Sequence, residues 1–268
     1  PGPAGFALYR GPARVPKILF LFRRVSVLPK VRAMNTRPTI AEIDLAALRH
    51  NFRTICRQAG SDRQLLAVVK ADAYGHGAIE ISKFALKNGV SCLGVANADE
   101  GVQLRVSGID APILILSPST ASEINEIVKY NLTPSVSDVD FARKLDERFG
   151  KEGREIAVHI EVDTGMGRGG TFHSEAVDTI REIYNLPNVR VEGIFSHLSL
   201  SEEEEDEYNK RQWKLFKEVL ERLEKEGIEI TVDQSGVEQR TEAQLFFTGA
   251  IVIGDDGVFP VVFEAIDD

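Results

Sequence analysis

The sequence predicts an α/β protein, a (β/α)8 barrel of the TIM type, from two observations. From Ile40 onward, short runs of strand character alternate with segments of helical periodicity, which is typical of parallel strands joined by crossover helices. The strand-like runs number eight, the number that closes such a barrel. A doubly wound open sheet is the alternative, but it more often has a glycine-rich turn after its first strand, and none follows here.

The predicted strands are runs of apolar and β-branched residues. In chain order they are Leu65–Lys70, Cys92–Ala96, Ile113–Leu116, Thr133–Val136, Ile156–Val162, Arg190–Ser196, Ile228–Val232 and Gln244–Phe247. Helical periodicity predicts helices over Leu45–Ala59, Ala78–Lys87, Asp99–Val106, Ala121–Lys129, Val139–Phe149 and Glu175–Tyr184. Two further strands, Ile40–Asp44 and Val258–Ile266, are expected outside the barrel, which spans about Leu65 to Gly254.

A second class of segment is strongly acidic. The run Glu202–Glu207 precedes an amphipathic stretch that contains Trp213 and Phe216, so we interpret it as the solvated start of a helix. Carboxylates suit the positive end of a helix dipole, and Ser199 or Ser201 can serve as the cap. A metal site is not indicated, because the five histidines are scattered and no pair has ligand spacing.

Composition narrows the class of protein. Of 268 residues, 43% are hydrophobic and 27% are charged, which excludes a wholly disordered, collagen-like or membrane-spanning chain. The net charge of −9 argues against nucleic acid and anionic membranes as partners. Cys56 and Cys92 lie far apart without C-x-x-C spacing, so neither a disulfide scaffold nor a thiolate zinc site is expected. A reducing cytoplasm is the predicted location.

The first 33 residues differ in charge from the rest, with seven Lys and Arg and no acid. Their apolar stretch, Ile18–Phe22, is far too short to span a bilayer. An organelle transit peptide fits the basic character. The alternating pattern begins only at Ile40, which favours a disordered or non-native leader over residues 1–33 and a barrel domain over residues 34–256.

The most informative stretch is L-L-A-V-V-K-A-D-A-Y-G-H-G at Leu65–Gly77. It places Lys70 at the carboxyl end of the first strand, where barrel enzymes have their active sites. An apolar strand behind the side chain can desolvate it, and desolvation favours the neutral amine that forms a Schiff base. The alternative is a strand-end lysine that only reaches water.

Val68–Gly77 resembles the signature of the alanine racemases, which are barrel-type enzymes dependent on pyridoxal 5'-phosphate. The resemblance extends over most of residues 38–268. Its other segments are T-I-A-E-I-D-L-A-A-L-R-H-N at Thr39–Asn51, V-A-N-A-D-E-G-V-Q-L-R at Val95–Arg105, V-D-T-G-M-G-R at Val162–Arg168 and G-I-F-S-H at Gly193–His197. It implies an isomerase of D-alanine biosynthesis that interconverts L- and D-alanine through an aldimine on Lys70, with a homodimer where the full second domain is present.

The resemblance also implies site residues. Lys70 is the lysine that holds the cofactor and the base for one face of the substrate, and Tyr74 packs near the cofactor. Arg168 hydrogen-bonds its phenolic oxygen, as suits a planar guanidinium. His197 lies beside the ring. Glu161 stands where many members have a carbamate-bearing lysine, and its carboxylate is expected to hold Arg168 in a charge-assisted pair.

The phosphate-binding residues implied by the resemblance are Ser235, Gly249 and Ala250. They follow the seventh and eighth predicted strands, where barrels commonly bind phosphate, so the general rule and the resemblance agree.

The sequence departs from the family in three places. Phe247 stands where an arginine usually faces the pyridine nitrogen, and Ile253 where a tyrosine is usual. Asp233–Arg240 matches poorly beyond Ser235. Residues 257–268 resemble only the first strand of the family's second, all-β domain, and none of the five tyrosines maps onto the second base that this domain supplies.

These departures keep two alternatives to a racemase open. One is a non-catalytic or impaired pyridoxal phosphate-binding barrel, favoured by Phe247 and by the missing second domain. The other is a purely structural barrel, which would not require an intact lysine-containing decapeptide.

Overall fold

The computed structural model describes residues 42–59, 64–199 and 207–228, and three short strands within 245–259. The chain divides into two compact units, Pro1–Ala41 and Glu42–Asp268, and every described residue belongs to the second. The predicted leader and almost all of the predicted strand Ile228–Val232 lie outside the described residues. Ile228 itself is described and is not in a strand.

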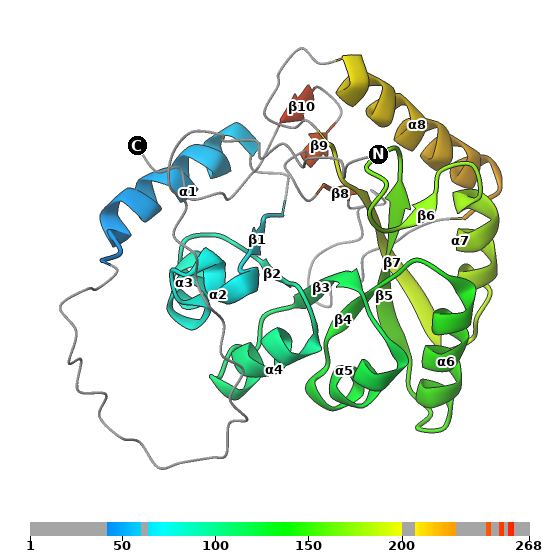
Figure 1. The fold of residues 1–268 in the computed structure, drawn as a ribbon, viewed down its shortest axis with the longest axis horizontal. Helices are drawn as coiled ribbons and strands as arrows, with labels where there is room; N and C mark the ends of the chain where they lie inside the picture. The colour runs from blue at the N-terminus through cyan, green and yellow to red at the C-terminus, as the bar shows by residue number, and fades with distance from the viewer. Residues whose placement is uncertain are drawn as a thin grey trace, which may run out of the picture. The chain divides into compact units, whose positions relative to one another are not determined.

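The core of the fold is one parallel sheet with its strands in chain order (Figure 1). The paired strands are β1 (Leu66–Val68), β2 (Cys92–Val95), β3 (Ile113–Pro118), β4 (Thr133–Val136), β5 (Ile156–Asp163), β7 (Val189–Ser196) and β8 (Leu245–Phe247). All six pairings along this path are parallel. A doubly wound sheet would reverse its strand order partway. The sequential order therefore confirms the barrel-type fold.

Helices connect these strands close to the predicted positions. They are α1 (Leu45–Ala59), α3 (Ala78–Lys87), α4 (Ala98–Val106), α5 (Ile124–Tyr130), α6 (Val139–Gly150), α7 (Ala176–Tyr184) and α8 (Glu207–Lys225). The predicted helix Ala121–Lys129 begins as a 3-10 turn, η1 (Ala121–Glu123). Side-chain caps explain two of the starts, since Asn97 accepts the N–H of Glu100 and Asp138 accepts the N–H of Phe141.

Two predictions about the edges of the domain need correction. The predicted strand Ile40–Asp44 is wrong for its described residues, since Glu42–Asp44 form no strand. Instead, Asp44 Oδ1 accepts the N–H groups of Ala46 and Ala47 and starts α1. At the other end, β9 (Val252–Gly254) and β10 (Gly257–Phe259) form an antiparallel pair. The rest of the predicted strand Val258–Ile266 lies outside the described residues.

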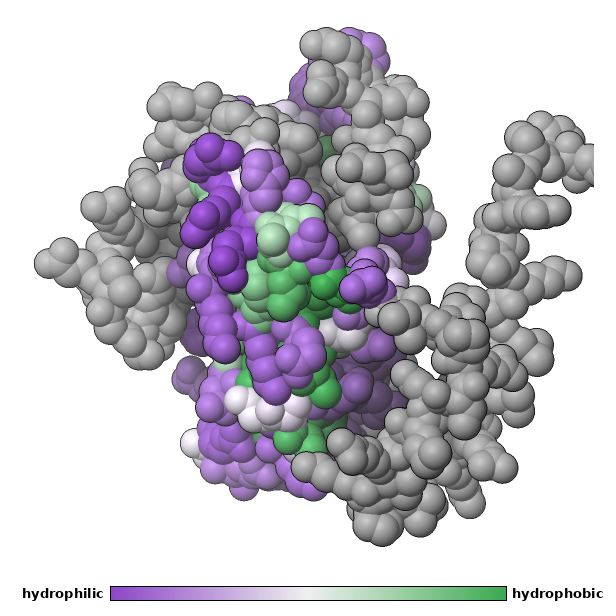
Figure 2. Space-filling view, turned by 90° about the vertical axis from the view of Figure 1, so that its left-hand side faces the viewer, coloured by the Kyte–Doolittle hydropathy of each residue, from purple (hydrophilic) through white to green (hydrophobic). Residues whose placement is uncertain are grey.

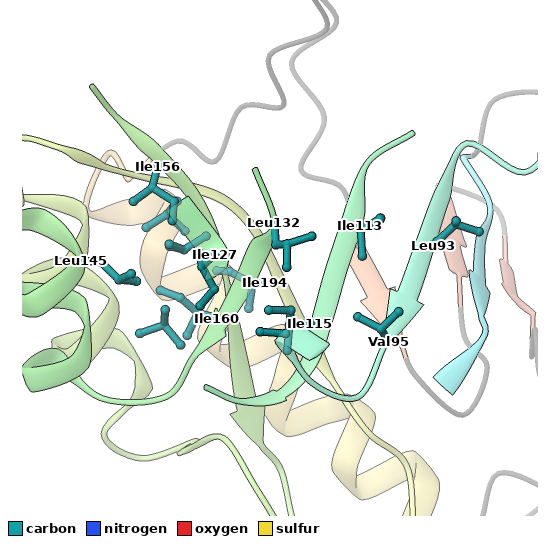
Figure 3. Close-up of a cluster of buried hydrophobic side chains, with 14 of the residues drawn as sticks. Leu93, Val95, Ile113, Ile115, Ile127, Leu132, Leu145, Ile156, Ile160 and Ile194 are labelled. Atoms are coloured by element: carbon teal, nitrogen blue, oxygen red, sulfur yellow. The ribbon is translucent and has the colours of Figure 1, made fainter. Parts of the chain in front are cut away.

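The hydrophobic core lies between the strands and the helices that cover them (Figure 3). In β5, Val158, Ile160 and Val162 belong to this core, while the alternate residues His159 and Glu161 are buried polar groups on the opposite face. Burying each large aliphatic side chain contributes about 1.5–3 kcal/mol. Packing of the helical face thus fixes which β5 side chains point into the barrel.

Among the residues that Figure 2 colours by hydropathy, hydrophilic ones are the more frequent, and hydrophobic ones form a patch near the centre of the view. Large exposed apolar side chains, such as Leu45, Val106 and Tyr184, come from three different helices. Within the described ranges, no helix is both long and apolar enough to cross a bilayer.

Candidate active site

Four predicted site residues follow or end strands β1, β5 and β7. Lys70 comes after β1, Glu161 lies in β5 with Arg168 in the loop beyond it, and His197 directly follows β7. Two effects among them are electrostatic: the positive charges of Arg168 and Lys70 both lower the pKa of His197, and Arg168 opposes the rise that burial causes in the pKa of Glu161. The structure therefore brings together the side chains that the sequence predicts for one site.

Lys70 begins an unusual turn, α2 (Lys70–Tyr74), shown after β1 in Figure 1. The sequence predicted a strand through Lys70, but the strand ends at Val68. Ala71, Asp72, Ala73 and Tyr74 have φ values of 51°, 58°, 52° and 55°, so they form a left-handed helical turn. Such a conformation costs L-residues roughly 1–2 kcal/mol each, which is why local propensity gives no sign of it.

Hydrogen bonds close this turn from both ends. The N–H of Gly75 donates to Ala71 O at 3.2 Å, and Gly75 has a φ of 89°, which suits glycine. Asp72 Oδ1 accepts the N–H of Ala78 at 2.8 Å and so starts α3. Lys70 is half-buried, and its Nζ lies 5.9 Å from the centre of the Tyr74 ring. The turn thus carries two of the residues that the resemblance places near the cofactor.

The loop that carries Arg168 is fixed by hydrogen bonds to two side chains, those of Asp163 and Tyr208. The carboxylate of Asp163 accepts the N–H groups of Gly165 at 2.8 Å and Gly167 at 3.1 Å. The hydroxyl of Tyr208, from α8, donates to Gly165 O at 2.7 Å. Gly165 has a φ of 137°, and a Cβ there would lie 2.7 Å from that hydroxyl oxygen. The loop geometry therefore requires glycine, and it leaves the Arg168 side chain exposed.

Glu161 is a buried carboxyl beneath this loop, with 6% of its surface exposed. Burial raises its pKa from an ordinary 4.5 to about 7, against the opposing effect of Arg168 and with the help of Asp163. A Cβ on Gly169 would lie 2.9 Å from Glu161 Oε2, so the loop passes close over the carboxyl. The charge-assisted pair with Arg168 that the sequence analysis expects is not formed among the described residues: no ion pair within 4.0 Å joins the two side chains, although the positive charge of Arg168 still acts on the Glu161 carboxyl.

His197 is half-buried, and its pKa is lowered from 6.5 to about 4. Burial is the main cause, followed by the positive charges of Arg168 and Lys70. The imidazole is therefore neutral near pH 7 and sits in a positive field. A ligand that carries negative charge would find favourable electrostatics beside it.

Gln212, on α8, is a residue of this region that sequence reasoning missed. Only 1% of its surface is exposed. Its Nε2 donates to Thr164 Oγ1 at 3.3 Å and to His197 O at 3.1 Å, and its Oε1 accepts the N–H of Ser199 at 2.9 Å. One side chain thus ties the start of the Arg168 loop to the His197 segment. The available signal was its place four residues before Phe216 in the apolar stripe of the helix.

The predicted phosphate-binding residues Ser235, Gly249 and Ala250 lie outside the described residues, so their role stays a prediction. Phe247 ends β8 and pairs with Ser196 of β7. Its backbone is therefore next to the strand end that leads into His197.

Comparison with known proteins gives a consistent match. Residues 43–237 match the family model of the alanine racemase N-terminal domain. Alanine racemase 2 of Caldanaerobacter subterraneus subsp. tengcongensis is 40% identical over 197 residues, which cover 73% of this chain and 51% of that protein.

Solved structures agree. Alanine racemase of Clostridium difficile 630 has a TM-score of 0.66 and 32% identity, over 70% of this chain and 51% of that one. Alanine racemase of Bacillus anthracis with bound L-Ala-P has a TM-score of 0.65 and 30% identity, over 77% and 50%. The chain spans about half the length of these relatives. It belongs to the alanine racemase family and contains that family's N-terminal, barrel-type domain.

Proposed function

We propose that this chain is the cofactor-binding barrel of a pyridoxal phosphate-dependent alanine racemase, an isomerase that interconverts L- and D-alanine. One observation carries the proposal: Lys70, Arg168 and His197 follow different strands, and the positive charges of Lys70 and Arg168 both act on the His197 ring. Family membership supports the choice of reaction, since the relatives are named alanine racemases and one of them was solved with L-Ala-P.

The described residues fit the cofactor. Pyridoxal phosphate is an anionic, planar molecule with an aldehyde that a lysine amine can hold. The half-buried Lys70 supplies the amine, and the positive field that lowers the pKa of His197 suits the negative charge of the cofactor. When bound, this cofactor supplies an electron sink for negative charge at the substrate's α-carbon.

Each residue then has a separate role. Lys70 would hold the cofactor through its amine, and that amine, once the amino group of the substrate has taken its place, would move the α-proton on the face presented by D-alanine. Arg168 donates hydrogen bonds to the phenolic oxygen, while Glu161 lies beneath it as a supporting carboxyl. His197, neutral at physiological pH, would lie beside the cofactor ring, and Tyr74 would pack near the cofactor. Ser235, Gly249 and Ala250 are assigned to the phosphate.

Covalent attachment provides the direct test. The 268-residue chain is incubated with pyridoxal phosphate, reduced with borohydride and digested, and the labelled peptide is identified by mass spectrometry. We expect the label on Lys70, and its loss in Lys70→Ala with the fold retained. Lys87→Ala, an exposed lysine in the last turn of α3, is the matched control and should label like the wild type. A label on another lysine would refute the assignment.

A second function, a pyridoxal phosphate-binding barrel without racemase activity, is favoured by Phe247. An apolar ring at that position cannot hydrogen-bond the pyridine nitrogen, so the protein would tune the cofactor differently. The two functions separate in heavy water. The racemase reading expects exchange of the α-proton of D-alanine, whereas a binding barrel would attach the cofactor without exchange.

We also propose that the whole protein is a cytoplasmic homodimer that acts on alanine and contacts neither nucleic acid nor membrane. The net charge of −9 and the two well-separated cysteines support this environment. Light scattering of the full-length protein would test the dimer, with a monomeric mass as the contradicting result.

A further inference from the structure

Two glutamates each connect neighbouring βα units, because each carboxylate accepts one backbone N–H group from its own loop and one from the unit before it. Glu100, in the first turn of α4, accepts two backbone N–H groups, one with each carboxylate oxygen. Its Oε1 accepts Ala71 N–H at 2.9 Å, from the loop after β1, and its Oε2 accepts Ala96 N–H at 2.8 Å, from its own loop after β2.

Glu123 repeats this geometry one strand further along. Its Oε1 accepts Ala98 N–H at 3.1 Å, from the first residue of α4, and its Oε2 accepts Thr120 N–H at 2.8 Å, from its own loop after β3. Both glutamates are half-buried. The two bridges are alike in their two backbone bonds, although Glu123 Oε2 also accepts the Thr120 hydroxyl at 3.0 Å. Only the Glu100 bridge reaches the turn that carries Lys70.

We propose that Glu100 is a positioning residue that holds the left-handed turn at Lys70, and so places the Lys70 amine for its reaction. Ala71 is the first left-handed residue of the turn, and its N–H lies one peptide beyond Lys70. Four consecutive L-residues in this conformation are unfavourable by themselves, so the surrounding structure has to hold them. The inference rests on the proposed function, because it concerns the role of Lys70.

Glu100 is itself well fixed. Asn97 Oδ1 accepts its backbone N–H at 3.0 Å, and its carboxylate lies at the positive end of α4. The other bonds that shape the turn, from Ala73 N–H to Val69 O and from Ala78 N–H to Asp72 Oδ1, stay within the same βα unit. Glu100 instead connects the turn to the next unit of the barrel, since it lies in α4.

The substitution that isolates this role is Glu100→Gln, with Glu123→Gln as its matched control. In either orientation of its amide, glutamine removes the negative charge from both hydrogen bonds and turns an NH2 group toward one of the two N–H groups, so the Ala71 bond is weakened or lost in Glu100→Gln and the Ala98 bond in Glu123→Gln. Two readouts are taken on the 268-residue chain: the dissociation constant for borohydride-reducible attachment of pyridoxal phosphate at Lys70, and the hydrogen-exchange rate of the Ala71 amide by NMR.

We expect Glu100→Gln to weaken attachment about tenfold to a hundredfold, the equivalent of one charge-assisted hydrogen bond, and to speed Ala71 exchange at least tenfold. Glu123→Gln should leave the dissociation constant and the Ala71 exchange rate within about twofold of the wild type. It should lower the melting temperature by about as much as Glu100→Gln does. A merely structural role would make the two variants equal in attachment, which would overturn the inference. Wild-type attachment in Glu100→Gln, or an unprotected Ala71 amide in the wild-type chain, would overturn it as well.

The failures remain separable. Were the wild-type chain to attach no cofactor at Lys70, the proposed function would fail, and unchanged Ala71 exchange in Glu100→Gln would still decide against the role of Glu100. Should Glu100→Gln not fold, Glu100→Asp takes its place, because the shorter side chain cannot reach both loops, and the same two readouts apply.

Discussion

Replacement of Gln212 by methionine tests whether one buried amide holds the Arg168 loop and the His197 segment together. Methionine has a similar length and fills the same space without hydrogen bonds. The change removes the three hydrogen bonds to Thr164, His197 and Ser199. A neutral hydrogen bond contributes about 0.5–1.5 kcal/mol, so we expect the free energy of unfolding to fall by about 2–4 kcal/mol.

Part of that loss is limited by partners that remain. Thr164 Oγ1 also pairs with Ser196 Oγ at 2.9 Å, so this hydroxyl keeps one hydrogen bond. The Ser199 N–H and the His197 carbonyl both lose their hydrogen bonds with Gln212, a residue of which only 1% of the surface is exposed. An N–H group that loses its acceptor away from solvent costs more than the bond itself, so the loss at Ser199 places the expectation toward the upper half of the range.

Urea unfolding followed by circular dichroism measures the effect, with Gln103→Met as the control. Gln103 is an exposed residue in the middle of α4, and its replacement should change the free energy by less than about 0.5 kcal/mol. Borohydride-trapped attachment at Lys70 is followed in parallel, because displacement of the Arg168 loop should weaken it. A Gln212→Met variant as stable as the Gln103→Met control would refute the role assigned to the amide.

Three further predictions concern protons. The folded pKa of about 7 for Glu161 exceeds its ordinary 4.5, so the free energy of unfolding of the wild type should fall by up to about 3 kcal/mol as pH rises from about 4.5 to 7. Glu161→Gln should lack this loss, and an equal pH dependence of urea unfolding in the two proteins would contradict the prediction. The folded pKa of about 4 for His197 lies below its ordinary 6.5, so the free energy of unfolding should fall as pH drops from about 6.5 to 4. The NMR chemical shifts of the ring should stay constant from pH 8 to 5, and a ring that titrates near 6.5 would refute the burial argument. With pyridoxal phosphate in heavy water, the 268-residue chain should exchange the α-proton of D-alanine slowly and form little L-alanine, since one general base contributes about 10²–10⁴-fold on its own; full racemase turnover would mean that this sequence supplies a second base.

Elements governed by local periodicity and capping were predictable from the sequence. The bounds of α1 and α3 match the prediction, because an apolar face and a nearby carboxylate cap both act within a few residues. Sequential pairing of β1 through β5 also follows from strand–helix alternation. These features were predictable because they follow from the order and spacing of residues that are close together in the sequence.

The turn after β1 was not predictable in the same way. Four left-handed residues contradict the local propensity of alanine, aspartate and tyrosine, so a strand through Lys70 was the reasonable expectation. The turn depends on a carboxylate from another unit, Glu100, which lies 29 positions further along the chain. Gln212 is also distant in sequence from its partner, since it lies 48 positions from Thr164. No spacing within a single element signals such contacts.

This difference separates two kinds of residue in the site. Residues matched by the family resemblance, such as Lys70 and Arg168, are those whose atoms would meet the cofactor. Residues found only in the structure, Glu100 and Gln212, satisfy backbone groups of the loops that carry them. A substitution of the second kind removes no reactive atom, yet it shifts a loop whose conformation is costly or whose polar groups are buried. Such variants should therefore retain the ability to label Lys70 at high cofactor concentration, whereas Lys70→Ala should not label at any concentration.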